Sequence, residues 1–333
     1  MKKTLTISIA AYNVEKFLKK TLESLIVDNM EKLEVLIVND GSKDNTTKIA
    51  KEYCKKYPNC FKLIDKKNGG YGSTINASIK KATGKYFKQL DGDDWYDNNN
   101  LKKYLDDLEK CDSDIVYTPL LQYYEYNGKY EEYEDKVKVE NGTYKLNEVI
   151  KDFPIIKMHS LAFKTEILQK NNILITEHCF YTDTQYVLFP LLFSRTITIY
   201  DYPIYIYRLG LEDQSVSIKG KLKHYQDHVK ADYDIMKFMT NNRRIKISKN
   251  IDKYICQYLV MLFSSCIGKY LMVVKPSKEQ YKYIREYDNK VLEYSKDVYN
   301  GMQEYSKAVK ILRNNSYTQY KMLYYIKRLL KRF

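Results

Sequence analysis

Hydrophobic and polar positions in the first 120 residues alternate between two periods. Leu5 to Ala10 alternates apolar and polar residues, whereas Val14 to Ile26 carries apolar residues at helical spacing. Glu34 to Val38 is a continuous β-branched run, typical of a strand covered on both faces. A second helix capped at Asp44 would reach Tyr57, followed by a third strand at Phe61 to Asp65 and a third helix at Ser73 to Ala82. The fourth strand is Tyr86 to Leu90 and the fifth is Asp114 to Tyr117. This rhythm predicts an α/β domain with a mainly parallel sheet and helices on both faces.

Polar residues stand where the predicted strands end. Asn13 follows the first strand, Asp40 the second and Asn68 the third, and Asp91 and Asp93 follow the fourth. In open parallel sheets, ligands bind beyond the carboxyl ends of the strands. The sequence therefore predicts one ligand site at this edge.

The pattern changes after residue 120. Tyrosine-rich segments flank Asn127-Gly128, which is a strong hairpin signal. Residues 143–217 mix short strands and helices, and the chain beyond about residue 220 looks helical. We expect an α/β domain over 1–220, with a nucleotide-sugar half (1–120) and an acceptor half (121–220), followed by a basic all-helical region over 221–333.

Composition narrows the class of protein. Apolar residues make up 44% of the chain, which excludes a disordered protein. Met1 is followed directly by a polar-alternating strand, so we expect no signal peptide and a cytoplasmic protein. The apolar stretch Leu259 to Val274 is shorter than the roughly 20 residues that a bilayer crossing needs, which favours a buried helix. The cysteines form no CxxC pair and are expected to be free thiols.

Charge is distributed unevenly. Residues 221–333 hold 24 Lys and Arg against 10 Asp and Glu, whereas residues 1–220 hold 32 of each kind. Residues 316–333 predict an amphipathic helix. Its apolar side would carry Met322, Leu323, Ile326, Leu329, Leu330 and Phe333, opposite Lys321, Lys327, Arg328, Lys331 and Arg332. Two interpretations stay open: a helix lying on anionic lipid, or a terminal helix packed on its own domain. No aromatic–basic module points to nucleic acid.

Candidate chemistry centres on Asp91-Gly92-Asp93-Asp94. Aspartates on one tight turn offer the oxygen ligands that a hard divalent cation prefers, with positions left open for diphosphate oxygens. Such a cation offsets the charge that grows on a departing nucleotide. The alternative is a loop whose acidic residues cap the next helix, and Asp-x-Asp alone is a weak motif.

A glycine-rich segment precedes this cluster. Asn68-Gly69-Gly70-Tyr71-Gly72 would let the backbone approach a ligand closely. It is not a dinucleotide fingerprint, because Ile75 stands where the third glycine would be. The chain also has no GxxxxGK[ST] phosphate loop.

In combination, several segments resemble family 2 glycosyltransferases of the GT-A fold, over about residues 4–217. The matching segments are Ser8-Ile-Ala-Ala-Tyr-Asn13, Glu34-Val-Leu-Ile-Val-Asn-Asp-Gly-Ser42, Asn68-Gly-Gly-Tyr-Gly-Ser-Thr-Ile-Asn-Ala77, Ala82-Thr-Gly-Lys-Tyr-Phe87, Asp91-Gly-Asp-Asp-Trp95, Tyr205-Ile-Tyr-Arg208 and Gln214-Ser-Val-Ser217. Their order and spacing agree with the family's.

The resemblance implies an inverting transferase that uses a divalent metal, Mn²⁺ or Mg²⁺. Tyr12 and Asp40 would bound the nucleobase, Asp91 would contact the ribose and metal region, and Asp93 would bind the metal. Arg208 suits the diphosphate. The full donor site implied is Ala11, Tyr12, Asn13, Asp40, Asn68, Gly70, Asn76, Asp91, Gly92 and Arg208, with Asp93 and Asp91 as metal ligands.

The resemblance also implies a catalytic base at the start of a later helix. The matching stretch is Phe180 to Tyr186, which makes Asp183 the candidate, although Thr182 replaces the glutamate of the family's Glu-Asp pair. The alternative for Asp183 is a plain helix cap. His159 either lines the acceptor or metal site or is a structural histidine.

The leading hypothesis is a glycosyltransferase that moves a sugar from a nucleotide-sugar, expected to be a UDP-sugar. Its acceptor would be a surface glycan or a lipid-linked saccharide at the cytoplasmic membrane face. A sugar-phosphate nucleotidyltransferase is the alternative enzyme, but it would need a basic glycine-rich loop where Ala11 to Val14 stands. The third hypothesis, a non-catalytic glycan-binding scaffold, is supported only by Thr182.

Overall fold

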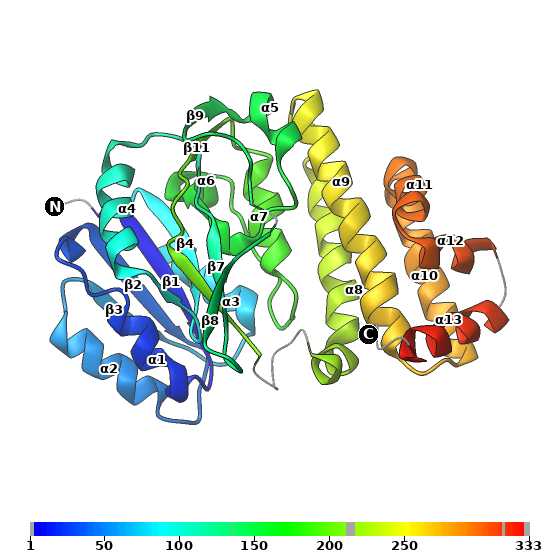
Figure 1. The fold of residues 1–333 in the computed structure, drawn as a ribbon, viewed down its shortest axis with the longest axis horizontal. Helices are drawn as coiled ribbons and strands as arrows, with labels where there is room; N and C mark the ends of the chain where they lie inside the picture. Colours follow the sequence, from blue (N-terminus) through cyan, green and yellow to red (C-terminus); the bar gives the residue numbers. More distant parts are fainter. Residues whose placement is uncertain (1–2, 135, 211–216, 315–316, 330–333) are drawn as a thin grey trace. The chain divides into compact units, whose positions relative to one another are not determined.

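The structure is a computed structural model that describes residues 3–134, 136–210, 217–314 and 317–329. It divides the chain into two compact units, Met1–Leu211 and Glu212–Phe333 (Figure 1). The first unit is α/β and the second is helical, as the sequence predicted. The predicted element Gln214-Ser-Val-Ser217 lies outside the described residues, apart from Ser217.

The first unit is built on an eight-stranded sheet in the order β3-β2-β1-β4-β10-β6-β11-β9. Strands β3, β2, β1 and β4 are parallel, whereas β10 is antiparallel to both β4 and β6. The strands are β1 (Leu5–Ala11), β2 (Leu33–Asn39), β3 (Phe61–Asp65), β4 (Tyr86–Asp91), β6 (Ile115–Tyr117), β9 (Gly142–Lys145), β10 (Leu161–Lys164) and β11 (Thr196–Ile199).

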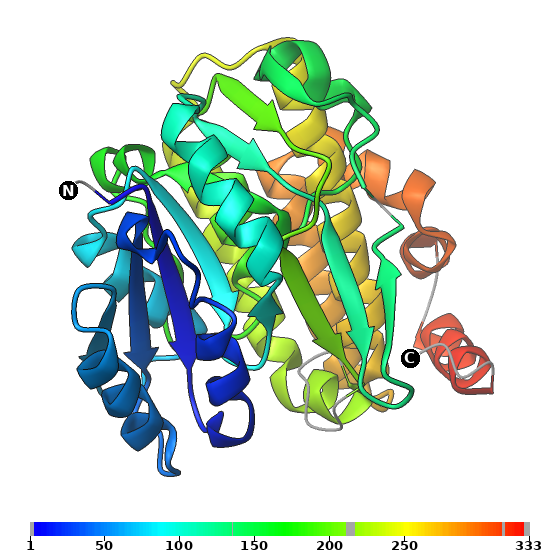
Figure 2. The same cartoon turned by 60° about the vertical axis from the view of Figure 1, so that its left-hand side comes forward.

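A second, four-stranded sheet has the order β5-β12-β7-β8 (Figure 2). Its strands are β5 (Trp95–Tyr96), β7 (Leu120–Tyr124), β8 (Lys129–Glu132) and β12 (Tyr205–Leu209). Strands β7 and β8 pair antiparallel around Gly128, whose φ is +68°, which confirms the predicted hairpin at Asn127-Gly128. Strand β5 directly follows the aspartate turn and pairs with β12, so this small sheet anchors the turn.

Helices cover both faces of the large sheet. Helices α1, α2 and α4 pack against one face through a continuous apolar core, and α3 packs with α6 on the other. The helices of this unit are α1 (Glu15–Glu23), α2 (Thr46–Lys56), α3 (Tyr71–Lys81), α4 (Asn98–Lys110), α5 (Leu146–Val149), α6 (Thr165–Lys170) and α7 (Asp183–Leu191), with short turns η1 (Met30–Lys32), η2 (Ile150–Asp152) and η3 (Met158–Ser160).

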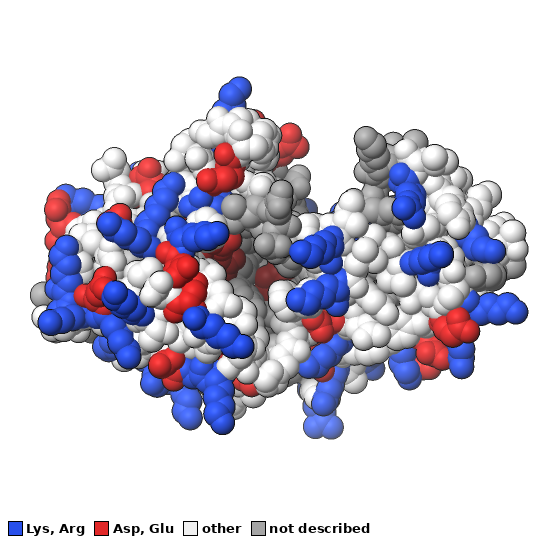
Figure 3. Space-filling view, turned by 90° about the horizontal axis from the view of Figure 1, so that it is seen from below, with Lys and Arg blue, Asp and Glu red and all other residues white. Residues whose placement is uncertain are grey.

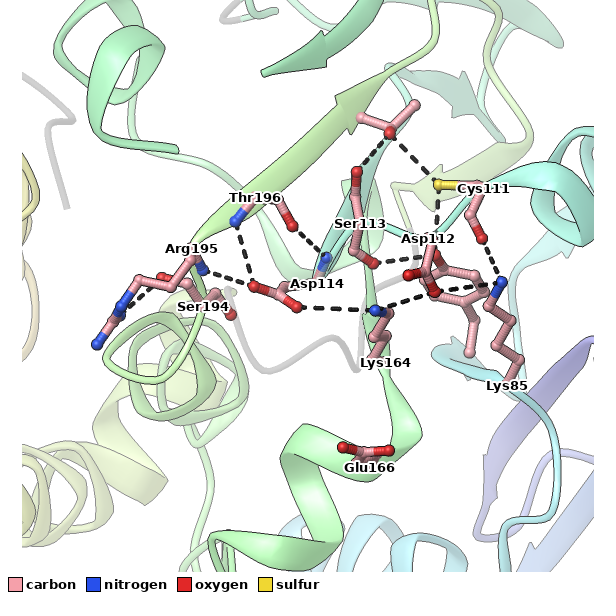
Figure 4. A network of polar contacts seen from close by, with 12 residues as sticks. Lys85, Cys111, Asp112, Ser113, Asp114, Lys164, Glu166, Ser194, Arg195 and Thr196 are labelled. Carbon is pink, nitrogen blue, oxygen red and sulfur yellow. Dashed lines mark hydrogen bonds and ion pairs between the residues drawn. The ribbon is translucent and has the colours of Figure 1, made fainter. Parts of the chain in front are cut away.

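A polar network fixes the antiparallel strand β10 in the sheet, at the edge opposite the carboxyl ends of β1, β2 and β4 (Figure 4). Lys164 pairs with Asp112 (3.1 Å), which also pairs with Lys85 (3.5 Å). Asp114 accepts hydrogen bonds from the backbone amides of Arg195 (2.7 Å) and Thr196 (3.2 Å). These contacts tie the ends of β4, β6, β10 and β11 together, so the sequence-distant strand β10 is held beside β4.

The second unit consists of helices around a buried core. They are α8 (Ile218–Asn241), α9 (Lys249–Ser265), the π-helical turn η4 (Cys266–Tyr270), the 3₁₀ turn η5 (Leu271–Val273), α10 (Lys278–Tyr294), α11 (Lys296–Tyr305), α12 (Lys307–Asn314) and α13 (Tyr317–Leu329). Asp232 on α8 accepts hydrogen bonds from Tyr287 on α10 (2.6 Å) and is within 3.2 Å of His228. This polar cluster therefore ties α8 to α10.

The segment Lys249–Val273 is the one described helix that is long and apolar enough, by length and composition alone, to cross a membrane. Of its most apolar window, 61% is buried inside the structure. Leu259, Phe263, Ile267 and Leu271 are all buried, which agrees with the expectation of a buried helix.

Candidate functional site

The turn after β2 is organised by the buried carboxylate of Asp40. One of its oxygens accepts hydrogen bonds from the Lys66 ammonium (2.6 Å) and the Gly69 amide (2.9 Å), and the other accepts from the Gly70 amide (2.9 Å). The side-chain amide of Asn68 donates to the Asp40 backbone carbonyl (3.0 Å). Asp40 therefore fixes the 68–70 loop against the end of β2.

Gly70 is required at its position by two independent features. Its φ is +80°, in the left-handed region that L side chains rarely adopt. A Cβ there would also lie 3.2 Å from the backbone of His178 and Cys179. The backbone of the glycine-rich loop is therefore in close contact with residues 178–179 of the same unit.

The loop after β1 lies beside the Asp40 turn. Ala11 ends β1, and its carbonyl accepts a hydrogen bond from the Asp40 amide (2.9 Å). Asn13 has a φ of +53°, and its side chain accepts from the Lys43 amide (2.8 Å). Tyr12, between them, leaves 49% of its surface exposed. The predicted nucleobase pair Tyr12 and Asp40 therefore sits on neighbouring strand ends, with the exposed ring of Tyr12 available to a ligand.

The aspartate turn closes β4. Gly92 donates to the Ala10 carbonyl (3.1 Å), and a Cβ at Gly92 would lie only 2.8 Å from that oxygen. Only glycine fits there, because any side chain would push the turn away from β1. The turn therefore holds Asp91, Asp93 and Asp94 beside the end of β1.

Asp94 is the buried, structural member of the turn. Its carboxylate accepts hydrogen bonds from the Tyr205 hydroxyl (2.6 Å) and the Arg208 amide (2.7 Å), both on β12. Burial and the neighbouring Asp93 and Asp91 hold the pKa of Asp94 well above its ordinary value. The side chain fastens the turn to the small sheet.

Asp93 carries charge that the chain compensates poorly. Burial, followed by repulsion from Asp91, raises its pKa to about 6, while Arg208 and His159 act in the opposite direction. The Arg208 guanidinium binds the Asp93 carbonyl (2.8 Å) and the Glu125 carboxylate (2.5 Å), not the carboxylate of Asp93. A carboxylate in this state is suited to a bound cation.

Two side chains lie beside the carboxylate of Asp91. From the sequence, Tyr71 had no expected role at the site, and two interpretations of His159 stayed open. The Tyr71 hydroxyl donates to one of its oxygens (2.7 Å), and Nε2 of His159 lies 3.8 Å from the other. His159 is buried, and its Nδ1 has no hydrogen-bond partner among the described residues. His159 thus lies at the aspartate turn and not in an unrelated part of the core.

Asp183 converges on the same place from α7. It is the first residue of that helix, and Thr182 occupies the cap position. The carboxylates of Asp91 and Asp183 both raise the pKa of Tyr71, after the larger effect of burial, and both also raise the pKa of Tyr207. Residues 91 and 183, far apart in sequence, therefore lie around one pair of tyrosines.

Two buried hydroxyls flank Asp183. Neither Thr182 Oγ1 nor Thr184 Oγ1 has a hydrogen-bond partner within the described part of the chain. Thr182 stands at the position of the glutamate in the family's Glu-Asp pair, so a hydroxyl replaces a carboxylate in the residue before Asp183. Buried polar groups are nearly always paired in proteins, so two unpaired hydroxyls beside Asp183 are unusual.

Two predicted donor contacts have other partners in the structure. Asn76 donates to the Ile175 carbonyl (2.8 Å) and accepts from the Ile175 amide (2.8 Å), so its amide holds the 175 segment against α3. Arg208 lies between the rings of Phe17 and Trp95 (4.8 Å each) and pairs with Glu125. These contacts hold the guanidinium beside the aspartate turn, and its contact with the diphosphate stays a prediction.

The residues present fit a hard divalent cation. Single ligand atoms of Asp91, Asp94 and His159 lie within 4.8 Å of one another, and Asp93 adds a further poorly compensated carboxylate. Oxygen ligands with an imidazole suit manganese or magnesium sites. The three residues whose ligand atoms lie close together include Asp94, whereas the sequence predicted Asp93 as a metal ligand. Both oxygens of Asp94 are engaged by β12, so Asp93 remains our preferred partner of Asp91.

Tyr71, Tyr205 and Tyr207 were missed by sequence reasoning. With 35 tyrosines in the chain, composition does not distinguish those at a site. A usable signal was position: Tyr71 follows the two glycines, and Tyr205 and Tyr207 belong to a matched motif. A fully buried Lys88 was also missed. Its ammonium donates to the carbonyls of His159 (2.6 Å) and Leu161 (3.3 Å) and so positions His159.

Comparison with known proteins agrees with this arrangement. Residues 6–171 match the sequence model of the family described as "Glycosyl transferase family 2". The chain is 38% identical over 113 residues to the minor teichoic acid biosynthesis protein GgaB of Bacillus subtilis, a match that covers 33% of this chain and 13% of that protein. The leading curated relatives are matched over only a quarter to a third of their own lengths.

Solved structures show the same fold. The structure of Staphylococcus aureus TarS in complex with UDP-GlcNAc aligns with a TM-score of 0.54 at 19% identity and covers 91% of each chain. The mannosyltransferase PcManGT of Pyrobaculum calidifontis, in complex with GDP-Man and Mn²⁺, aligns with a TM-score of 0.53 at 13% identity, covering 100% of this chain and 89% of that one.

The family match, the strand order and the aspartate turn at the end of β4 lead to one conclusion. Residues 6–171 of this chain carry the sequence pattern of glycosyl transferase family 2, and the amino-terminal unit that contains them has the GT-A fold.

Proposed function

We propose that this unit is an inverting, metal-dependent glycosyltransferase that moves a sugar from a UDP-sugar to a hydroxyl of a surface glycan or lipid-linked saccharide. The observation that carries the proposal is the aspartate turn at the end of β4, where the Tyr71 hydroxyl donates to Asp91 (2.7 Å) and His159 lies 3.8 Å away. Helix α7, which begins at Asp183, packs against η3, the short turn that carries His159. Because Asp183 lies beyond the matched family segment 6–171, this packing supports the base assignment separately from the family match.

In this proposal residues 1–120 bind the donor and residues 121–220 the acceptor. Asp91 and Asp93 hold Mn²⁺ or Mg²⁺, which supplies positive charge against the charge growing on the departing diphosphate. Tyr71 orients Asp91 through its hydroxyl (2.7 Å). Tyr12 offers an exposed ring to the nucleobase. The loops held by Asp40, Asn13 and Asn68 give the donor pocket its shape.

Asp183 is the general base. It accepts the proton of the acceptor hydroxyl while that oxygen forms a bond to the anomeric carbon and the bond to the diphosphate oxygen breaks. One in-line displacement inverts the anomeric configuration. Asp183 is the first residue of α7, so the helix backbone fixes where its side chain starts.

Names of relatives support the substrate classes. TarS was solved with UDP-GlcNAc and PcManGT with GDP-Man and Mn²⁺, and GgaB is named for minor teichoic acid biosynthesis. From these we favour a nucleotide-sugar donor, UDP before GDP, and a cell-envelope acceptor. The reaction would take place on the cytoplasmic side of the membrane, where nucleotide-sugars are made.

The test uses the purified full chain with UDP-Glc, UDP-Gal, UDP-GlcNAc, UDP-GalNAc and GDP-Man, each with Mn²⁺, Mg²⁺ or EDTA. We expect a metal-dependent rise in Tm and slow nucleotide release with a UDP-sugar. Asp183→Asn should keep the Tm shift and lose roughly 10²–10⁴-fold in nucleotide release. Asp201→Asn, an exposed aspartate in the same unit, is the matched control. No response to any donor would overturn the proposal, and a response to GDP-Man alone would correct the donor.

A further inference from the structure

Helix α13 packs on its own unit with only part of its apolar surface. Tyr320, Leu323 and Tyr324 are buried. Met322, Ile326 and Leu329, which the sequence placed on the same apolar side as Leu323, are 49%, 42% and 83% exposed. Helix α13 therefore packs on its own unit and also exposes apolar side chains to solvent. Packing on its own domain, the second of the two interpretations from the sequence, describes only its buried side. Leu330, Lys331, Arg332 and Phe333 lie outside the described residues.

The first turns of α8 have the same character. Ile218 and Leu222, one helical turn apart, are 53% and 45% exposed. Lys219 and Lys223 are exposed beside them. Where exposed apolar side chains form a contiguous patch, they often mark an interaction site.

Three lysines bring these two segments together. Lys327 of α13 donates a hydrogen bond to the Gly268 carbonyl in η4, next to Lys269. Lys221 of α8 lies over the ring of Tyr270 (5.9 Å to its centroid), the residue that follows Lys269. The three lysines therefore lie around η4, and Lys269 and Lys221 lower the pKa of Lys327 after the larger effect of burial. In sequence, the exposed Leu222 follows Lys221 and the exposed Ile326 precedes Lys327.

We propose that this surface, formed by Ile218, Lys221 and Leu222 of α8, Lys269 of η4 and Ile326, Lys327 and Leu329 of α13, docks the protein on an anionic phospholipid bilayer. Charge complementarity selects this occupant. A bilayer offers anionic headgroups to the lysines and an acyl boundary to the flanking apolar side chains. In the view from below, Lys and Arg side chains are spread over the helical unit, with fewer acidic ones among them (Figure 3).

The docking surface adds a membrane contact to the proposed function, and it does not include residues of the candidate catalytic site. An enzyme acting on lipid-linked or surface saccharides gains effective concentration when held at the membrane. Donor binding involves the other unit, so the two proposals fail separately.

The experiment is flotation of the full chain with phosphatidylglycerol vesicles and with phosphatidylcholine vesicles. Each cation near an anionic leaflet accounts for about a fivefold change in binding. Lys221→Gln/Lys269→Gln should therefore bind phosphatidylglycerol vesicles roughly 25-fold more weakly. The matched control is Lys237→Gln/Lys253→Gln, two exposed lysines about 24 Å along α8 and α9 from the trio by helical rise. This control should lose much less affinity for phosphatidylglycerol vesicles.

A second variant tests the apolar part. Ile326→Ser/Leu329→Ser should weaken binding to phosphatidylglycerol vesicles at least fivefold and leave the donor-induced Tm shift and the circular dichroism spectrum unchanged. Equal binding of wild type to both vesicle types would overturn the proposal, as would equal losses in the two lysine double variants. A dimer in analytical ultracentrifugation that Ile326→Ser/Leu329→Ser dissociates, without vesicle binding, would reassign the surface to a protein contact.

Discussion

Two turns of the amino-terminal unit begin alike and end differently. Strands β2 and β4 both lead into an Asp-Gly dipeptide at the same edge of the sheet, Asp40-Gly41 and Asp91-Gly92. At the first turn a lysine and two backbone amides neutralise and bind the Asp40 carboxylate. At the second turn the carboxylates gather with little positive charge to balance them, and the pKa of Asp93 rises to about 6.

The glycines differ in the same way. Gly41 is needed for its backbone conformation, with a φ of +76°, whereas Gly92 is needed for close contact with the Ala10 carbonyl. We call the first turn complete, because its carboxylate is satisfied within the chain, and the second incomplete, because the chain does not balance the charge of its carboxylates. The same dipeptide thus forms a structural turn at one strand end and part of the candidate site at the next.

The largest expected effect comes from removing charge at the incomplete turn. Asp93→Ala should lower metal-dependent nucleotide release by about 10³-fold, because the cation loses a ligand at the position where charge develops. The free energy of unfolding should hardly fall. Nucleotide release under saturating Mn²⁺ measures the effect, with Asp201→Ala as the control of equal charge change. Activity within tenfold of wild type would exclude Asp93 as a metal ligand.

The complete turn should respond in the opposite way. Asp40→Asn places an amide donor against the Gly69 or Gly70 amide or the Lys66 ammonium, and it should lower the free energy of unfolding by about 2 kcal/mol. Urea unfolding measures it. Asp65→Asn, an exposed aspartate that accepts from Asn39, should cost well under half as much. If Asp40→Asn unfolds like wild type but fails to bind donor, Asp40 belongs with the ligand site and the comparison is wrong.

Local patterns in the sequence were enough for the elements that build both turns. Alternation and helical spacing predicted the strands β1 to β4 and β6 and the helices α1 to α3, because each depends on neighbours along the chain. They did not indicate the short strand β5 or helix α4. The insertion of β10 between β4 and β6 was not predictable, since it depends on pairing across more than 40 residues and on the lysine–aspartate network around Asp114.

Side-chain partners were harder to predict than elements. Asn76 and Arg208 stand in matched motifs, but their contacts are with Ile175, Glu125 and two aromatic rings, which no local pattern indicates. A helical projection likewise placed Leu323 and Met322 on one side of α13, and only packing distinguishes the buried one from the exposed one. The metal ligands and the base in the site remain predictions at the level of individual residues.

A smaller effect appears in the pH dependence of the metal-free protein. Because the folded-state pKa of Asp93, about 6, exceeds its ordinary value of 3.8, ionised Asp93 destabilises the fold above pH 6. The shift corresponds to roughly 3 kcal/mol, which partial exposure reduces to about 2 kcal/mol. In EDTA, Asp93→Asn should therefore be more stable than wild type at pH 8, and the gap should close below about pH 4. Urea unfolding at both pH values measures it, and a gap independent of pH would contradict the charge argument.

The smallest expected effect concerns the link between the turn and α3. Tyr71→Phe removes the hydroxyl that donates to Asp91 (2.7 Å) and leaves the ring in place. Because the hydroxyl orients one carboxylate oxygen, its loss should raise the Mn²⁺ concentration for half-maximal nucleotide release by about fivefold to tenfold, corresponding to roughly 1 kcal/mol. At saturating Mn²⁺ the rate should approach that of wild type.

A change in the Mn²⁺ dependence without a change in the saturated rate would show that the Tyr71 hydroxyl orients Asp91 and does not act on the substrate. Tyr53→Phe, which removes a hydroxyl bonded to the exposed Glu23 (3.2 Å), is the matched control and should leave the metal dependence unchanged. If Tyr71→Phe instead lowers the saturated rate and keeps the Mn²⁺ dependence, the hydroxyl acts on the substrate. The Asp91 oxygen that accepts the hydrogen bond from the Tyr71 hydroxyl would then lie outside the metal site. The cation at the incomplete turn would be held by Asp93 and His159.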